Sequence, residues 1–351
     1  MPLVSDKSLA KLLRETSRSF YLTLRVLPAA VRLQIGLAYL LARTTDTIAD
    51  TELVPLAQRL DALHALGERI LGTSVAPLNF GELARQQAAP AERALLENCE
   101  ASLAALRELS PVDLQLTRTV LNTITSGQEL DLRRFAPLEF TLQRAADKLK
   151  LELQPQQIIA LRTDEELDDY TYRVAGCVGE FWTKMCRAHL FPTATLDDLF
   201  LLSNGVRFGK GLQLVNILRD LPGDLRKGRC YLPSERLSAV GLSAADLLQP
   251  GNQPKFRPLY DNYLAAAEAH LAAGWAYTNA LPRRCGRVRL ACAWPILIGM
   301  KTLARLRTSN VLDPQQRIKI TRLEVKALIL RSVLFYPWPS AWKKLFPSSG
   351  H

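Results

Sequence analysis

Two pairs of aspartates have the spacing that best suits metal chemistry in this sequence. Asp46 and Asp50 end an apolar stretch at residues 31–45, and Asp220 and Asp224 end another at residues 199–221. Residues four apart lie on one face of a helix, so each pair places two carboxylates side by side. Two such charges repel each other unless a cation lies between them. Hard oxygen ligands suit Mg²⁺, which keeps several waters and takes its remaining ligands from phosphates.

One aspartate pair alone is common on solvated helices, so other residues must support the metal hypothesis. Arg43 precedes the first pair and Arg219 precedes the second, and each offers a planar donor to a phosphate. The apolar segments that carry both pairs are too hydrophobic to be solvated faces. Together these features predict a cavity with apolar walls and two metal–phosphate sites at its rim. The expected substrate has a long hydrocarbon tail and a diphosphate head.

The elements that must position these residues are helices. Leu-, Ala-, Arg- and Glu-rich segments with helical periodicity predict an all-α fold with few strands. Ser110 and Thr195 are the expected N-terminal caps of two of these helices. Loops are expected at residues 73–77 and 249–258. The expected helices include residues 56–71, 92–109, 112–126, 168–189, 199–221 and 260–279.

Composition limits the classes of protein that this chain can be. The 351 residues are 48% hydrophobic and 23% charged, without a linker-like tract, which predicts one domain over residues 1–351 with a core of about residues 12–331. The net charge of +11 is concentrated late in the chain, but no base-stacking platform, zinc finger or RNA-binding motif accompanies it, so nucleic acid is not an expected partner. Six scattered cysteines and no signal peptide predict a cytoplasmic protein.

No window reaches the ~18 apolar residues that span a bilayer. Residues 290–300 are the most apolar stretch, and because Pro295 interrupts them we expect a buried core helix. The tail at residues 332–351 mixes tryptophan and phenylalanine with lysines, as interfacial segments do. Peripheral contact with the inner face of the membrane and packing on the protein's own surface stay open as alternatives for this tail.

Over roughly residues 17–326 the chain resembles the squalene/phytoene synthases, head-to-head members of the isoprenoid synthase fold. Five motifs in the same order carry this resemblance: Ser17-Arg-Ser-Phe20, Tyr39-Leu-Leu-Ala-Arg43, Asp46-Thr-Ile-Ala-Asp50, Tyr170-Thr-Tyr-Arg-Val-Ala-Gly-Cys-Val-Gly179, and Gly211-Leu-Gln-Leu-Val-Asn-Ile-Leu-Arg-Asp220 with its continuation to Pro233. The resemblance implies a single-domain, all-α isoprenoid synthase bundle around a central apolar cavity.

The resemblance also implies roles for individual residues. Asp46, Asp50, Asp220 and Asp224 would hold Mg²⁺, with Mn²⁺ as a substitute. Phe20 would lie beside the prenyl chain, while Val174, Ala175, Gly176 and Gly179 would be small, either to leave room for that chain or to let helices pack closely. The residues expected to line the diphosphate sites are Ser17, Arg18, Ser19, Tyr39, Arg43, Gln213, Asn216, Arg219 and Arg229.

The implied reaction joins two farnesyl diphosphates through presqualene diphosphate to squalene, with a final hydride from NADPH. No glycine-rich dinucleotide fingerprint is present. Arg317, Lys319 and Arg322 resemble the family's contacts to the cofactor phosphates, and a solvated basic turn is an equal alternative. Squalene is favoured over phytoene, dehydrosqualene, presqualene diphosphate and hydroxylated squalene by the 46–50 motif and by Cys292-Ala-Trp-Pro295. The different-class alternative is a non-catalytic basic scaffold, and the expected state is a monomer.

Three positions depart from the family pattern. Pro222 and Gly223 lie inside the second acidic pair and are expected to end the helix, which would leave Asp224 on a loop. Ala49 stands where many relatives carry glutamate. Arg173 stands where animal squalene synthases carry a tyrosine that is thought to handle a proton. Tyr172 or Tyr39 is therefore the expected catalytic tyrosine.

Overall fold

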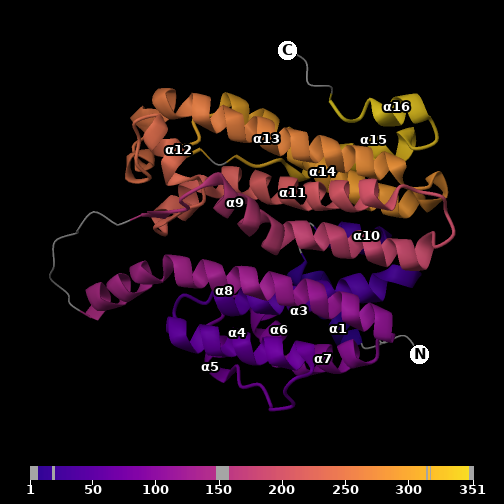
Figure 1. The fold of residues 1–351 in the computed structure, drawn as a ribbon, viewed down its shortest axis with the longest axis horizontal. Coiled ribbons are helices and arrows are strands. Elements are labelled where there is room, and N and C mark those ends of the chain that lie inside the picture. The colour runs from indigo at the N-terminus through magenta and orange to yellow at the C-terminus, as the bar shows by residue number, and fades with distance from the viewer. Residues whose placement is uncertain (1–6, 18–19, 148–157, 314, 317, 348–351) are drawn as a thin grey trace. The chain divides into compact units, whose positions relative to one another are not determined.

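This computed structural model describes residues 7–17, 20–147, 158–313, 315–316 and 318–347. Helices dominate the described chain, and the strands found there are two short ones, β1 (Ile159–Ala160) and β2 (Arg229–Cys230), which pair in parallel (Figure 1). The all-α prediction is confirmed. No helix in these ranges is long and apolar enough to cross a bilayer. The cytoplasmic location and the monomeric state stay predictions.

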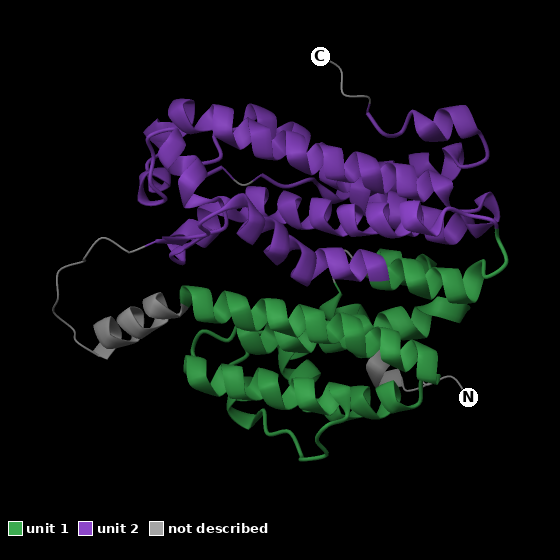
Figure 2. Ribbon diagram, viewed as in Figure 1, with its two compact units in different colours: residues 1–139, 181–194 green, residues 140–180, 195–351 purple. Residues whose placement is uncertain are grey.

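The chain divides into two compact units (Figure 2). Unit 1 comprises residues 1–139 and 181–194, and unit 2 comprises residues 140–180 and 195–351. The expected single domain stays a prediction, as does the central cavity.

Unit 1 is built around α3 (Ala29–Ala49), whose buried residues include Leu37, Leu41 and Ile48. The predicted helix at residues 92–109 is two helices that break at Asn98. Ser110 caps the next helix as predicted, because its hydroxyl accepts the Asp113 amide at 3.2 Å. The other helices of this unit are α1 (Lys7–Thr16), α2 (Phe20–Val26), α4 (Leu56–Leu71), α5 (Gly81–Arg85), α6 (Pro90–Glu97), α7 (Cys99–Arg107) and the greater part of α8 (Pro111–Asp147).

Unit 2 is built around α11 (Asp198–Arg226), α13 (Gln253–Ala280) and α14 (Gly286–Thr308), which contact one another. Residues 290–300 form the buried middle of α14, as expected. The remaining helical segments are α9 (Asp164–Thr171), a π-helical turn η2 (Tyr172–Gly176), the start of α10 (Cys177–Leu190), α12 (Ser234–Ala239), η3 (Ala245–Leu248), η4 (Pro250–Asn252), η5 (Arg283–Cys285), α15 (Arg322–Phe335) and α16 (Pro339–Lys343).

Two local predictions in unit 2 are wrong. The side chain that caps α11 is Asp197, not Thr195, because the Asp197 carboxylate accepts the Phe200 amide at 2.9 Å. The loop predicted at residues 249–258 is instead the 3₁₀ turn η4 followed by α13 from Gln253 onward. Pro254 lies in the first turn of α13, where a backbone donor has no partner within the helix and its loss costs nothing.

Glycines allow the segment from η2 into α10 to lie directly against α11. A Cβ atom on Gly179 would lie 1.8 Å from the Gly205 carbonyl oxygen, and one on Gly209 would lie 2.1 Å from the Ala175 carbonyl oxygen. These neighbours are backbone atoms, which cannot move aside as a flexible side chain could. Close helix packing therefore requires glycine at positions 179 and 209.

We expect Gly179→Ala to lower the free energy of unfolding by about 3 kcal/mol, because the added methyl group overlaps backbone. The control is Gly223→Ala, also in unit 2, where a Cβ atom would meet nothing within 4 Å. That change should be neutral or stabilising by up to about 1 kcal/mol. Urea unfolding followed by circular dichroism measures both, and equal effects would contradict the packing role of Gly179.

Candidate functional site

The first acidic pair lies at the C-terminal end of α3. Asp46 and Asp50 occupy its last turn and its C-cap, and the Asp50 amide donates to the Asp46 carbonyl at 2.8 Å. Arg59, a fully buried residue of α4, donates to the Ala49 carbonyl at 2.7 Å and so anchors this helix end. The C-terminal end of a helix carries partial negative charge, which adds to the repulsion between the two carboxylates. A cation at this position would relieve both.

Side chains from other helices of unit 1 hold Asp46. Gln128 of α8 donates a hydrogen bond to the Asp46 carboxylate. The Arg43 Nη1 atom lies 3.8 Å from Asp46 Oδ2, while its Nη2 atom contacts Glu92 Oε1 of α6 at 2.5 Å. Sequence inspection did not select Gln128, Glu92 or Arg59, because each comes from a distant segment and no local motif marks it.

These surroundings make Asp46 reluctant to ionise. Burial, and then the charge of Asp50, raise the pKa of Asp46 to about 7, against the opposing effects of Arg43 and Gln128. The side chain keeps 46% of its accessible surface, so water and ions reach it. Ionising both carboxylates of this pair is energetically unfavourable, and both are accessible to solvent. A bound divalent cation would offset the repulsion between them.

The second acidic pair lies in the last turns of α11, in unit 2. Asp220 binds the neighbouring Arg219 through two hydrogen bonds, Nε to Oδ1 at 2.9 Å and Nη2 to Oδ2 at 2.5 Å. These bonds raise the pKa of Arg219 above its ordinary value. Gln213 and Asn216 precede Asp220 by seven and four residues, so these side chains project from one side of α11. This helix end therefore combines carboxylates with neutral and cationic donors.

The expectation that Pro222 ends this helix is wrong, because α11 continues to Arg226. Proline removes the amide that would donate to the Leu218 carbonyl, four residues earlier. The hydroxyl of Tyr260, a fully buried residue of α13, donates to that carbonyl at 3.0 Å instead. Asp224 consequently keeps its helical position relative to Asp220. The sequence holds no local signal for this compensation, since Tyr260 lies in another helix.

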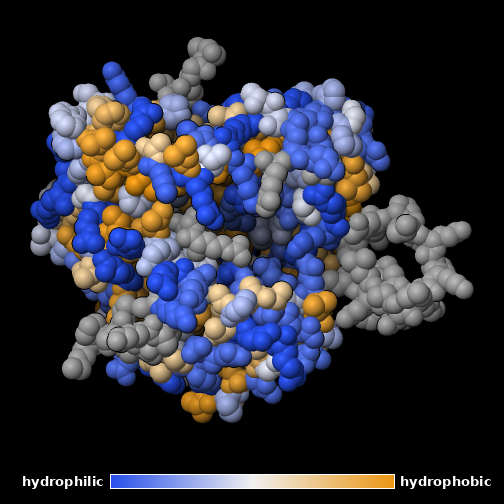
Figure 3. Space-filling view, turned by 180° about the vertical axis from the view of Figure 1, so that it is seen from behind, coloured by the Kyte–Doolittle hydropathy of each residue, from blue (hydrophilic) through white to orange (hydrophobic). Residues whose placement is uncertain are grey.

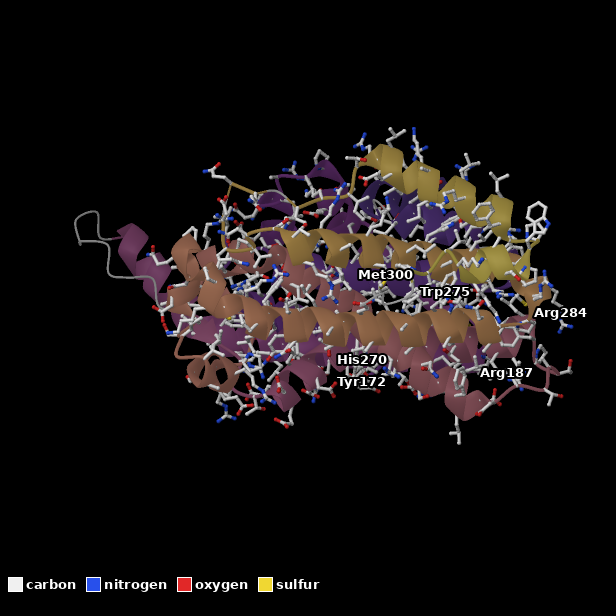
Figure 4. The ribbon with its side chains drawn as sticks, turned by 90° about the horizontal axis from the view of Figure 1, so that it is seen from above. Tyr172, Arg187, His270, Trp275, Arg284 and Met300 are labelled. Atoms are coloured by element: carbon white, nitrogen blue, oxygen red, sulfur yellow. The ribbon has the colours of Figure 1, made fainter. Side chains whose placement is uncertain are left out.

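The tyrosines proposed for proton transfer both donate hydrogen bonds. Tyr39 donates to the Thr16 carbonyl at 3.1 Å. Tyr172, labelled in Figure 4, donates to Glu180 at 3.2 Å. Burial, and then the charge of Glu180, raise the pKa of Tyr172, so this phenol gives up its proton less readily than a free tyrosine. Arg173 is occupied by an ion pair with Asp169 at 2.8 Å.

The other predicted site residues divide between the units. In unit 1, Ser17 donates to the Leu13 carbonyl at the end of α1. Arg18, Ser19, Arg317 and the side chain of Phe20 lie outside the described residues. Lys319 and Arg322 are exposed in unit 2, just before and at the start of α15. Also in unit 2, Val174, Ala175 and Gly176 belong to η2, and Arg229 begins β2.

Each acidic pair supplies two carboxylates, fewer than the six ligands that Mg²⁺ takes. In the described ranges, no three histidine, cysteine, aspartate or glutamate side chains gather into a ready-made metal site. Water and substrate phosphate would complete the coordination at either pair. The pairs lie in different units, and the cleft that would unite them stays a prediction.

Comparison with known proteins establishes the family. The squalene/phytoene synthase family model matches residues 13–324. The chain belongs to this family. It is 28% identical to the squalene synthase of Schizosaccharomyces pombe over 92% of this chain and 64% of that protein. It is also 28% identical to the bifunctional lycopene cyclase/phytoene synthase of Blakeslea trispora, over 90% of this chain and 48% of that protein. The chain thus spans about half to two thirds of these relatives.

Solved structures agree on the fold. The TcSQS complex with E5700 superposes with a TM-score of 0.74 at 20% identity, covering 97% of this chain and 89% of that one. Squalene synthase HpnC from Alicyclobacillus acidocaldarius superposes with a TM-score of 0.58 at 19% identity, covering 88% of this chain and 97% of that one. The predicted isoprenoid synthase fold is confirmed.

The raised pKa of Asp46 predicts a pH-dependent stability. Ionising Asp46 is harder in the folded chain than in the unfolded one, so folding stability falls as pH rises from about 4 to about 7 and then levels off. In EDTA above pH 7, Asp46→Asn should stabilise the protein by about 1 kcal/mol, a value reduced for solvent screening of a half-exposed group. At pH 4 the gain should vanish. Adding Mg²⁺ should stabilise the wild type and not the variant. Denaturation at both pH values measures this, and a gain that persists at pH 4 would contradict it.

The bond from Tyr260 to Leu218 predicts a coupled pair of substitutions. Tyr260→Phe leaves a buried carbonyl without its donor and should cost about 1–2 kcal/mol of stability. Pro222→Ala returns a backbone amide to position 222, so Tyr260→Phe should cost less in that background. A double-mutant cycle from urea unfolding measures the coupling. Additive effects would show that the hydroxyl does not replace the missing amide.

Proposed function

We propose that this chain is a prenyltransferase that condenses two farnesyl diphosphates head to head, through presqualene diphosphate, to squalene. The observation that carries the proposal is the repeated arrangement at the ends of α3 and α11. Each helix presents two carboxylates at its negative end with an arginine beside them. That arrangement is unfavourable by itself and becomes favourable with a divalent cation and a diphosphate bound.

The residues present suit Mg²⁺, with Mn²⁺ as a substitute, and Asp46, Asp50, Asp220 and Asp224 would hold it. Bound Mg²⁺ neutralises charge that develops on a departing diphosphate. Arg43 and Arg219 already contact the acidic pairs, at 3.8 Å and 2.5 Å, so small side-chain movements would bring their guanidinium groups to the phosphate oxygens.

The remaining roles follow the resemblance. Ser17, Gln213, Asn216 and Arg229 would donate to the two diphosphates, together with Tyr39. Apolar surroundings would protect each allylic cation from water. Tyr172 is the preferred proton carrier, since its bond to Glu180 gives it a carboxylate neighbour that can accept a proton.

NADPH is proposed as the final hydride donor. Lys319 and Arg322 support this, because both are exposed basic residues three apart in the sequence and available to cofactor phosphates. The segment is also held in place, since Arg305 donates to the Lys319 carbonyl.

A second candidate is a synthase without the reductive step, giving presqualene diphosphate, dehydrosqualene or phytoene. It is favoured by the phytoene synthases among the relatives and by a dehydrosqualene synthase structure with a TM-score of 0.62. The squalene proposal is preferred because the 46–50 motif and Cys292-Ala-Trp-Pro295 resemble squalene synthases more than phytoene synthases. Squalene synthases of two yeasts match 92% of this chain.

The test incubates the purified chain with radiolabelled farnesyl diphosphate and Mg²⁺, with and without NADPH. We expect squalene only with NADPH and presqualene diphosphate without it. Asp46→Asn and Asp220→Asn should each lower turnover by about 1,000-fold or more while the circular dichroism stays unchanged. The matched control is Asp198→Asn, at the other end of α11, which should keep full activity.

Other products discriminate the alternatives. Phytoene from geranylgeranyl diphosphate, or the same product with and without NADPH, would overturn the squalene assignment in favour of the second candidate. No product from either farnesyl or geranylgeranyl diphosphate would favour a non-catalytic basic scaffold.

A further inference from the structure

The outward face of α15 carries leucines where a water-soluble helix carries polar residues. Leu323, Leu330 and Leu334 are 77%, 60% and 53% exposed, and Ala327 between them is exposed as well. Their spacing of four, three and four residues places them in one stripe along the helix, about 16 Å long. We call these four residues the α15 stripe.

The opposite face of the same helix is the one that packs. Ser332 is fully buried there and accepts a hydrogen bond from the Trp294 Nε1 atom of α14 at 2.9 Å. A buried serine and exposed leucines reverse the pattern expected of a helix that has only water outside. In Figure 4 one side of α15, the yellow helix, carries side chains that project away from the other helices of its unit. In Figure 3 hydrophobic residues gather at the upper left, where α15 runs.

Basic residues border the stripe on both sides. The 100° turn per residue puts Lys326 on one flank and Arg331 on the other, and both are exposed. Glu324 is the acid on this helix, and it is already paired with Arg305 at 2.7 Å and Lys301 at 3.4 Å. The surface around the stripe is therefore positive and has no free acid from α15 to offset it.

The tail after α15 is fixed to the protein at Trp342 and exposed at Trp338. Trp342 is buried, and its ring stacks on that of Trp275 with the ring centroids 5.2 Å apart. Its Nε1 atom donates to Asn279 Oδ1 at 2.9 Å. Trp275 is labelled in Figure 4. Trp338, by contrast, is 62% exposed immediately after α15. The aromatic tail thus packs on its own unit at Trp342 and leaves one tryptophan outside.

We propose that α15 and Trp338 form a docking surface for an anionic lipid bilayer, on which the helix lies flat. The stripe enters the acyl boundary, Trp338 lies at headgroup depth, and Lys326 and Arg331 extend to the lipid phosphates. The stripe, its two basic flanks and Trp338 include none of the residues proposed to bind the metal, the diphosphates or NADPH, although Arg322 directly precedes Leu323.

Charge complementarity selects the lipid over a second copy of this chain. In a two-fold contact the same patch meets itself, so Lys326 and Arg331 of one copy would face those of the other without an acid between them. An anionic bilayer provides an apolar phase for the leucines of the stripe and negative charge for Lys326 and Arg331.

The experiment measures sedimentation of the full chain with vesicles of phosphatidylcholine and phosphatidylglycerol (3:1) and with vesicles of phosphatidylcholine alone. We expect binding to the anionic vesicles that weakens as salt rises, and much weaker binding to the neutral ones. Leu330→Glu with Leu334→Glu should weaken binding about tenfold or more. Lys326→Glu with Arg331→Glu should also weaken binding to the anionic vesicles at low salt.

Matched controls carry the same changes at exposed positions elsewhere. Val75→Glu with Leu199→Glu replaces two apolar residues that are 88% and 79% exposed, and should leave binding unchanged. Trp338→Phe should remove the vesicle-induced blue shift of tryptophan fluorescence, whereas Trp182→Phe, at a buried site, should not.

Two results would overturn the proposal. One is equal binding to anionic vesicles by the stripe variant (Leu330→Glu with Leu334→Glu) and by its control (Val75→Glu with Leu199→Glu). The other is a wild-type dimer that the stripe variant converts to monomer without any vesicle binding, which would assign the surface to a second copy. Circular dichroism of each variant confirms folding, and we expect it to be unchanged, because the substituted residues are exposed except Trp182, where phenylalanine keeps an aromatic side chain.

Discussion

The constraint on which this protein depends is negative charge collected at the carbonyl ends of helices. Asp46 and Asp50 lie at the end of α3, and Asp220 and Asp224 at the end of α11, where the helix itself is already partly negative. Burial, and then the charge of Asp50, raise the pKa of Asp46 to about 7. A bound cation would relieve this repulsion, and the ligand that we propose for both pairs is a metal-bound diphosphate.

Much of the surrounding structure holds these helix ends in place. Arg59 of α4 donates to the last carbonyl of α3, and Gln128 of α8 donates to the Asp46 carboxylate. In the other unit, Tyr260 replaces a backbone donor that Pro222 removes, so α11 stays helical through its second aspartate. Each acidic pair is thus positioned by side chains from neighbouring helices as well as by its own backbone.

The two faces of α15 show how one helix serves two environments. Its inner face packs on α14 through Ser332, while its outer face presents leucines between basic side chains. An enzyme that takes lipid-tailed diphosphates gains from lying where those lipids are held. Part of the basic charge late in the chain, at Lys326 and Arg331, borders this apolar stripe.

The sequence by itself determined the fold class, the family and the acidic pairs, because helical periodicity and short motifs are local properties. The order of five motifs was enough to indicate the family, which the family match over residues 13–324 confirmed. Tertiary structure alone decided what depends on residues distant in the chain: that Pro222 does not end α11, that Gly179 lies against the Gly205 backbone, and that Leu330 faces outward while Ser332 is buried. Local sequence patterns could not reveal these three features, because each depends on packing between helices. The first needs a hydroxyl from another helix, the second a neighbouring backbone, and the third the choice of which helix face packs.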